Sequence, residues 1–318
     1  MRRRLKHEYV RALAAARVDR IMAQVHARSE RVLILNLHRV SPDPNPFWPP
    51  LHPDAFRGLV AFVAGRCRVC RFAELADPTT DRRPVALLSF DDGCRDFVEY
   101  AMPILDEFHL PANHNVIGHA VRTGEPPFAI RVPDALNAVS VARLRGLRIE
   151  GFALRLEGDD DLARTRFGTA LCAYLKELPP ARRARVWSPV QALFEEAGTA
   201  SWTRMMDQAD VAAVAEAGHE VGSHSFSHES MAHLSVGEFE ADLDLSDALF
   251  AELGLPVEIY AFPNGSHRPG QIDVLLRRGI DHVLTIGRPS RARKGVHPRQ
   301  SIYGDTAAEL RLRAVGVV

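Results

Sequence analysis

The stretch Leu87–Gly93, which reads LLSFDDG, ends an apolar run with two adjacent aspartates and a glycine. The residues from 84 to 90 predict a buried strand of the kind found in parallel sheets. Two neighbouring carboxylates repel each other at the end of such a strand, and a bound metal ion would offset that repulsion. The alternative is that one aspartate caps a helix while the other is solvated. The stretch therefore points to a site where this strand ends.

The rest of the chain alternates short apolar runs with helical patterns. Helices are predicted at 53–65, 95–108, 207–217, 235–252 and 270–278, and strands at 32–38, 84–90, 113–119, 218–224, 257–262 and 281–286. Repeated alternation of strands and helices is typical of a parallel α/β sheet or barrel. Residues from about 122 to 205 break the rhythm, because they are rich in charge and in helix formers, with strand signals confined to 149–158. We expect them to form a mostly helical insertion.

Composition excludes several classes of protein. The chain has 318 residues, of which 46% are hydrophobic and 25% charged, so it can bury a core as one large domain or two small ones. Its 40 basic and 40 acidic side chains cancel, which argues against nucleic acid as a partner. The four cysteines show no disulfide framework, and the lone Cys67-x-x-Cys70 pair is interpreted as packing residues.

The first 30 residues predict a basic amphipathic helix, because apolar residues recur at roughly helical spacing between arginines from 5 to 25. Such a helix packs on the edge of a domain or docks to a membrane surface or a partner. The segment has no apolar core of the length that a signal peptide needs, and no later run is long enough to predict a transmembrane segment. We therefore expect a cytoplasmic protein with residues 31–318 as its folded domain.

Polar residues follow several of the predicted strands, at the end where α/β folds place their active sites. His38 ends one strand, and His224 and His228 follow another at a spacing that brings both imidazoles to one point on a tight turn. Two histidines and one carboxylate form a common set of ligands for a divalent metal. If one aspartate of the DD pair binds that metal, its neighbour stays free to act as a general base.

Three motifs resemble those of NodB-type polysaccharide deacetylases, which form carbohydrate esterase family four. SFDDG at 89–93 resembles the T/S-F-D-D-G motif of that family, and HSFSH at 224–228 matches its H-S/T-x-x-H motif. YAFPNG at 260–265 resembles its proline turn. The similarity runs in order from about residue 32 to 303, apart from the predicted insertion.

The resemblance implies a distorted (β/α)-barrel of about seven strands that removes N-acetyl groups from an amino-sugar glycan, glycolipid or sugar precursor. Asp91 would be the general base, and Asp92, His224 and His228 would bind the metal. Zinc is the expected metal, with cobalt or nickel as alternatives. Without a leader segment, the expected substrate is a nucleotide- or lipid-linked sugar or the precursor of an exported glycan.

The sequence departs from the family pattern at the residues that assist the catalytic aspartate. The family carries an arginine that braces this aspartate just before the proline turn, where Ala261 stands here. Arg299, in HPRQSI, is the expected replacement, and Arg268 is also near. Cys94 follows Gly93 where many relatives carry an aromatic residue.

The late L-x-H motif, which supplies a general acid in the family, is also missing. Instead LNLHRV at 35–40 resembles the Y-H-R-V motif of a circularly permuted subset, represented by biofilm poly-N-acetylglucosamine deacetylases. His38 then inherits the role of the acid, unless it is a structural histidine at the end of a strand.

Five further residues are predicted to contact or support the substrate. The backbone of Asn264 or Gly265 would donate to the oxyanion, Asn113 and Asn115 would face the site from a neighbouring strand, and Trp48 would stack on a sugar ring or else cover the core.

Two other functions remain open from the sequence. The same two-histidine, one-carboxylate set serves iron(II) oxygenases, although these carry their ligands close together on an all-β barrel. The chain would alternatively be a glycan-binding or assembly protein that kept the fold after losing part of the catalytic apparatus.

Overall fold

A parallel β-barrel forms the centre of the protein, and it confirms the predicted fold class. The computed structural model describes residues 2–29, 32–43, 45, 48–158, 160–197, 204–287 and 293–318. Within these residues, seven parallel strands close into a ring in the order β1, β3, β4, β5, β6, β7, β8, and β8 pairs back onto β1. Their bounds are β1 Leu33–Leu37, β3 Val85–Phe90, β4 Asn113–Val116, β5 Glu220–Ser223, β6 Ile259–Ala261, β7 His282–Ile286 and β8 Val296–Ser301.

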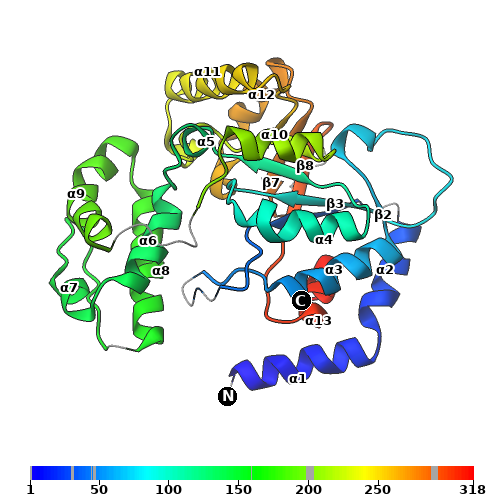
Figure 1. The fold of residues 1–318 in the computed structure, drawn as a ribbon, viewed down its shortest axis with the longest axis horizontal. Coiled ribbons are helices and arrows are strands. Elements are labelled where there is room, and N and C mark those ends of the chain that lie inside the picture. The colour runs from blue at the N-terminus through cyan, green and yellow to red at the C-terminus, as the bar shows by residue number, and fades with distance from the viewer. Residues whose placement is uncertain are drawn as a thin grey trace.

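Helices surround the barrel on its outer face (Figure 1). The helices are α1 Arg2–Ala15, α2 Val18–Arg28, α3 Pro53–Arg66, α4 Met102–Glu107, α5 Gly118–Thr123, α6 Phe128–Ala138, α7 Val141–Gly146, α8 Asp161–Glu177, α9 Pro180–Ala197, α10 Gln208–Glu216, α11 Val236–Glu252, α12 Pro269–Arg277 and α13 Ala307–Ala314. A π-helical turn, Phe97–Ala101, precedes α4. None of the helices in the described part of the chain has the length and apolar character needed to cross a bilayer.

Two strands of the structure have no counterpart among the predicted ones. β8 reads VHPRQS, which lacks the apolar alternation of a strand. Its backbone pairs with β7 on one side and with β1 on the other, and this pairing stabilises the strand. The two-residue strand β2, Arg68–Val69, pairs with the start of β3 outside the ring. Conversely, residues 149–158 form no strand, and only an isolated bridge joins Ile149 to Phe152 in this segment.

Helices α6 to α9 gather on one side of the barrel, where Figure 1 shows them in green. They pack around an apolar cluster of their own, which includes Leu136, Phe167, Leu171 and Leu175. The sequence predicted a helical insertion over about 122–205, of which residues 159 and 198–203 lie outside the described part. Because this group has its own core, it can hold a fixed position as a wall beside the barrel.

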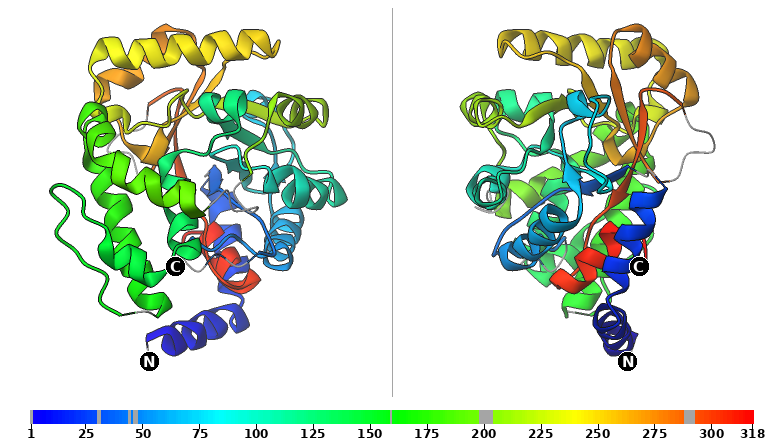
Figure 2. Two further views of the ribbon diagram at one scale, coloured as in Figure 1. Left: turned by 60° about the vertical axis from the view of Figure 1, so that its left-hand side comes forward. Right: turned by 90° about the vertical axis from the view of Figure 1, so that its right-hand side faces the viewer.

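The N-terminal segment forms two helices where one was predicted. The chain turns at Arg17, whose φ of 56° lies in the left-handed region. Helix α2 is tied to the end of the chain, since Arg311 Nε donates to Asp19 Oδ2 at 2.9 Å. Leu5 and Tyr9 of α1 remain 58% and 57% exposed, and Figure 2 shows α1 at the lower edge of the molecule. The predicted boundary at residue 30 lies outside the described residues.

Helix α3 packs against α13, and two of its glycines allow this contact to be tested. A Cβ atom added to Gly58 would lie 2.5 Å from the Cβ of Ala307 in α13, whereas a Cβ added to Gly65 would meet nothing within 4 Å. We expect Gly58→Ala to lower the free energy of unfolding by roughly 1–3 kcal/mol through overpacking. Gly65→Ala is expected to raise it by up to about 1 kcal/mol through helix propensity. Urea unfolding of both variants measures this, and equal effects would contradict the close contact between α3 and α13.

Candidate metal and catalytic site

The DD pair lies in a sharp turn directly after β3. Asp92 and Gly93 have φ values of 79° and 77°, so two consecutive residues adopt the left-handed conformation. His114, on the neighbouring strand β4, stabilises the turn because its Nε2 accepts the backbone N–H of Gly93 at 3.1 Å. Both carboxylates are almost completely buried, Asp91 at 2% exposure and Asp92 at 5%. The turn sends the two side chains to different partners.

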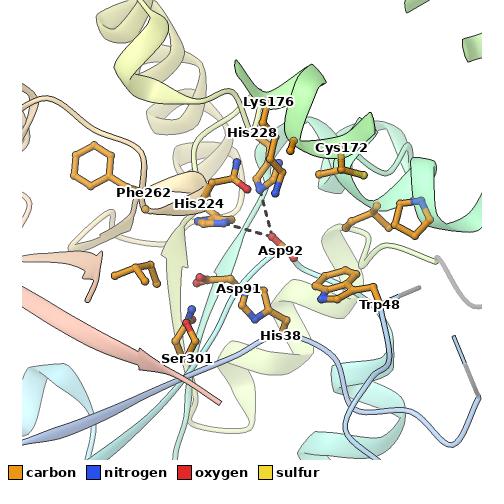
Figure 3. Close-up of a pocket in the computed structure, with 18 of the residues that line it drawn as sticks. His38, Trp48, Asp91, Asp92, Cys172, Lys176, His224, His228, Phe262 and Ser301 are labelled. Carbon is orange, nitrogen blue, oxygen red and sulfur yellow. Dashed lines mark ion pairs between the residues drawn. The ribbon is translucent and has the colours of Figure 1, made fainter. Parts of the chain in front are cut away.

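Asp92 meets the two histidines of the HSFSH motif. Its Oδ1 lies 3.4 Å from His224 Nε2 and 3.4 Å from His228 Nε2. Figure 3 shows the three side chains converging on one point, drawn with dashed lines. In the described part of the chain they are the one group of three or more His, Cys, Asp or Glu side chains whose ligand atoms lie within 4.8 Å of one another. The structure thus assembles the three side chains that the sequence predicted as metal ligands.

The distances suit a small tetrahedral cation. Zinc binds histidine nitrogen and carboxylate oxygen at about 2.0–2.2 Å, which places two tetrahedral ligand atoms roughly 3.3–3.5 Å apart. The two observed separations of 3.4 Å fall in this range. A direct charge-assisted hydrogen bond would instead be about 2.7–2.9 Å long. The spacing of the ligand atoms therefore favours a metal ion between them.

The hydrogen bonding of His224 gives independent support. Its Nδ1 lies 2.9 Å from the backbone oxygen of Ala261, and a carbonyl oxygen only accepts, so Nδ1 carries the proton. In the neutral imidazole, Nε2 then presents a lone pair toward the carboxylate of Asp92, which is also an acceptor. Two facing acceptors in a buried site need a cation or a proton between them.

The pKa values in this cluster follow from burial and charge. Burial raises the pKa of the Asp92 carboxyl, but its interactions with His224 and His228 outweigh this effect and hold that pKa well below its usual range. Burial lowers the pKa of His228 below its ordinary value, despite the carboxylate beside it. Asp92 is therefore an anion and His228 favours its neutral form, as metal ligands do. Burial lowers the pKa of His224, but the charge of Asp91 and the interactions with Asp92 outweigh it and raise that pKa above its ordinary value.

Asp91 lies in a second set of contacts and faces Arg299 of β8. The guanidinium donates from Nη1 to Oδ1 and from Nη2 to Oδ2, both at 2.7 Å, in a bidentate pair. Asn115 Nδ2 adds a third hydrogen bond to Oδ1 at 2.8 Å. Burial raises the pKa of Asp91, but the charges of Arg299 and His224 and the hydrogen bonds from Arg299 lower it to about 2. Asp91 is held as an oriented carboxylate.

Arg299, the residue that the sequence predicted in place of the family's arginine, reaches Asp91 from another strand than the one that carries Ala261. Ala261, in β6, contributes only its backbone oxygen to His224, while Arg299 reaches Asp91 from β8. Arg299 is 2% exposed and also donates to Ser89 Oγ at 3.1 Å. Arg268, the other arginine considered, is the residue before α12 and makes its backbone contact with Gln271.

Asn113 and Asn115 lie beneath Asp91 rather than on the wall of the cavity. Asn113 Oδ1 accepts a hydrogen bond from Ser89 Oγ at 2.8 Å, and Asn115 donates to Asp91. A Cβ on Gly222 would lie 2.3 Å from the side-chain oxygen of Asn115, so glycine at this position makes room for the amide. Asn115 helps to orient the carboxylate of Asp91, and neither asparagine is among the described residues that line the cavity.

A cavity of about 490 Å³ opens over both aspartates. His38 and Trp48 form one side of it, with their ring centroids 5.7 Å apart in an edge-to-face arrangement (Figure 3). Asn264 and Gly265 of the proline turn form another side. The backbone N–H of Gly265 donates to the Phe262 oxygen at 3.0 Å within the turn, so Asn264 is the remaining candidate donor of the two. Cys94 is 1% exposed and does not line this cavity.

Backbone strain coincides with the site. Among the described non-glycine residues with positive φ, Asp92, Ser225, His228 and Asn264 all belong to the turns around it. Asp242 of α11 holds the histidine turn, since its two carboxylate oxygens accept the backbone N–H groups of residues 226 and 227 at 2.9 Å each. Such strained positions persist where the surrounding structure fixes them, and they are common at functional sites.

Sequence reasoning missed several side chains of the site. Asn36 and Ser301 line the cavity from β1 and β8, and Lys176 lines it from α8. Asn36 carried a weak signal, because a polar residue interrupts an otherwise apolar strand. Nothing in the sequence placed Lys176 near the strand ends, since it lies within the insertion.

Comparisons with known proteins agree with this geometry. Residues 191–283 match the model of the polysaccharide deacetylase family, and this segment contains His224 and His228 but not the DD pair. The uncharacterized protein YlxY of Bacillus subtilis is 31% identical over 72 residues, which are 22% of this chain and 23% of that protein. The chain therefore matches about a quarter of the length of this relative.

Two solved structures share the fold. The Streptococcus pyogenes deacetylase PplD, in complex with acetate, has a TM-score of 0.58 and 15% identity, with 89% of this chain and 97% of that chain covered. IcaB from Ammonifex degensii has a TM-score of 0.55 and 17% identity, with 90% and 97% covered. The chain is thus polysaccharide deacetylase-like in its fold and in the segment that carries both histidines.

Proposed function

We propose that this chain is a metal-dependent hydrolase of the polysaccharide deacetylase family that removes an N-acetyl group from an amino sugar and releases acetate. The observation that carries the proposal is the spacing of Asp92, His224 and His228, whose facing acceptors suit a bound cation. A second oriented carboxylate, Asp91, lies next to this set and opens onto the same cavity. One carboxylate for the metal and one for proton transfer is the division that metal-assisted amide hydrolysis needs.

Asp92, His224 and His228 would hold the metal, for which we propose zinc. A bound divalent cation would polarise the acetamide carbonyl and make a water molecule at the site more acidic. The chemistry that remains, which is to accept one proton, donate another and stabilise the oxyanion, belongs to side chains and backbone of this chain.

Asp91 accepts the proton of the attacking water. Its pKa of about 2 keeps it ionised, and Arg299 and Asn115 orient its oxygens. The buried ion pair with Arg299 lowers the basicity of the carboxylate, so its contribution rests on position more than on proton affinity. Arg299 is a positioning residue here because its contacts are with Asp91 and Ser89.

His38 donates a proton to the departing amine, which is otherwise too poor a leaving group. It lines the cavity beside Asp91 and packs against Trp48, whose ring offers a flat apolar face to a sugar. The backbone N–H of Asn264 is the proposed donor to the oxyanion, since the proline turn borders the same cavity.

The descriptions of the matched family and of a similar solved structure support this reaction. The matched family is described as polysaccharide deacetylase, and PplD is described as a deacetylase in complex with acetate. The substrate of the present chain is proposed only as an N-acetylated sugar.

Acetate release tests the proposal. The zinc-loaded protein is incubated with N-acetylated chitotetraose, and acetate is measured with a coupled enzyme assay. We expect release that stops after removal of the metal by a chelator and returns when zinc is added back, with cobalt and nickel assayed in parallel. If no metal supports release from any acetylated sugar, the glycan-binding alternative replaces hydrolysis.

A further inference from the structure

The helical group α6 to α9 forms one wall of the catalytic cavity, and this wall comes mainly from one face of α8. Thr169, Cys172, Ala173 and Lys176 line the cavity, at positions i, i+3, i+4 and i+7 of the helix. Side chains at this spacing share one face, so helix geometry aims Lys176 toward the site together with the other three. Figure 3 shows Lys176 beside His228 at the upper rim of the cavity.

The end of α8 is fixed close to the metal ligands. The backbone oxygen of Lys176 accepts a hydrogen bond from Ser230 Oγ at 3.2 Å, and Ser230 follows His228 by two residues. The position of the lysine relative to the site is therefore set by the fold.

Lys176 differs from the other basic side chains nearby because it has no acidic partner among the residues that the structure describes. Among the described residues that line the cavity it is the one lysine or arginine, and no described carboxylate oxygen lies within 4.0 Å of its ammonium. By contrast, Lys6, which lines a neighbouring cavity, lies 2.7 Å from Glu309, and Arg299 is paired with Asp91. A cation without a partner in a concave site is available to an anionic ligand.

The net charge of the site with a divalent metal bound also favours an anionic ligand. Arg299 and Asp91 cancel, and a divalent cation exceeds the single charge of Asp92 by one. Lys176 adds a second positive charge, and apart from Asp91 and Asp92 none of the described residues that line the cavity is acidic. A cavity with this excess favours a substrate that carries negative charge of its own.

We infer that Lys176 binds an anionic group, a carboxylate or a phosphate, on the N-acetylated sugar substrate. This inference rests on the proposed deacetylation and specifies the class of sugar. The acetamide lies at the metal ligands, and the anionic group lies toward α8. The helical wall thereby selects acidic or phosphorylated sugars over neutral ones.

Kinetics with matched substrates test the inference. Acetate release by the zinc-loaded protein is compared for three substrates. Two are anionic, namely N-acetylglucosamine 1-phosphate and a hyaluronan tetrasaccharide that carries glucuronate, and the third is the neutral N-acetylated chitotetraose. In Lys176→Gln, the ratio of kcat/KM for the preferred anionic substrate to that for chitotetraose is expected to fall about 10-fold, mostly through KM. Lys176→Arg is expected to retain the ratio. Lys294→Gln removes an exposed lysine outside the cavity and serves as the control, with the ratio unchanged.

The two anionic substrates identify the source of the charge, since only the one whose group reaches Lys176 should lose its advantage. An unchanged ratio in Lys176→Gln, or an equal fall in Lys294→Gln, would overturn the inference. So would a wild-type protein that shows no preference for either anionic substrate.

A binding measurement separates this inference from the proposed reaction. Calorimetric titration of the zinc-loaded Asp91→Asn variant with the same three compounds, with and without Lys176→Gln, needs no turnover. If no compound yields acetate from wild type but Lys176→Gln weakens binding of an anionic compound about 10-fold, the anion site stands and hydrolysis fails. If Lys176→Gln leaves the binding of every compound unchanged, the anion site is wrong, whatever the activity.

Discussion

Replacing Asp92 by alanine is expected to weaken binding of a divalent cation by more than 100-fold and to reduce acetate release to the level of the metal-free protein. Asp92 is the anionic member of the proposed ligand set and lies 3.4 Å from both histidine nitrogens. Loss of an outer partner of a metal ligand already costs about 10–100-fold in affinity, so loss of the ligand itself should cost more. Metal content after dialysis, measured by elemental analysis, gives a readout independent of activity.

Asp92→Asn serves as the matched control, because it keeps the size of the side chain and one oxygen but removes the charge. We expect it to bind zinc more weakly than wild type and more strongly than Asp92→Ala. Circular dichroism establishes that both variants are folded. One zinc ion per chain retained by Asp92→Ala after dialysis would refute the assignment of this cluster as the metal site.

Asp91→Asn is expected to lower kcat by about 10²–10⁴-fold while the protein keeps its metal, because general-base catalysis contributes about this much. The two aspartates are expected to differ in their effect on metal binding because their side chains have different contacts. Asp91 is bonded to Arg299 and Asn115, whereas the two histidine nitrogens face Asp92. Zinc content and acetate release are measured on the same preparation. Wild-type activity in a metal-loaded Asp91→Asn protein would remove Asp91 from the mechanism.

The Asn variant leaves the buried Arg299 without a compensating charge, which costs stability in proteins by roughly 3–5 kcal/mol. Asp91→Glu is therefore a necessary second variant, since it keeps the charge and displaces the carboxylate by one methylene. We expect it to remain folded and still lose most of the activity. Activity close to wild type in Asp91→Glu would contradict a role that depends on the position of the carboxylate.

The pKa of Asp91 also sets an expectation for stability. It is lowered to about 2 in the folded protein, below the value of about 3.9 for an unperturbed aspartate. The ionised group therefore contributes stability that is present above about pH 4 and is lost as the pH falls toward 2. Asp91→Asn abolishes this part of the pH dependence, so the difference in stability between the two proteins should shrink as the pH is lowered through this window.

Much of the barrel was predictable from local patterns. The apolar runs identified β1, β3, β6 and β7 at nearly their observed places, because burial on both faces of a parallel strand selects apolar residues. The strand β8 was missed because its residues are mostly polar, and it forms through pairing with β7 and β1. Pairing between segments far apart in sequence leaves no local trace in such a strand.

The local sequence determined the candidate metal ligands and the turns that carry them. Asp92, His224 and His228 belong to short motifs whose strand context fixes where they point, since parallel strands end at one edge of the barrel. For the residues that assist them, the sequence offered Arg299 with Arg268 as a second candidate, and the tertiary structure decided between the two, because Arg299 reaches Asp91 across 208 positions of sequence. Only the tertiary structure brings Lys176 to the cavity, from a helical group with a core of its own. A short motif encodes which groups can do the chemistry, but the closure of the barrel and the packing of the insertion determine which distant side chains orient and surround them.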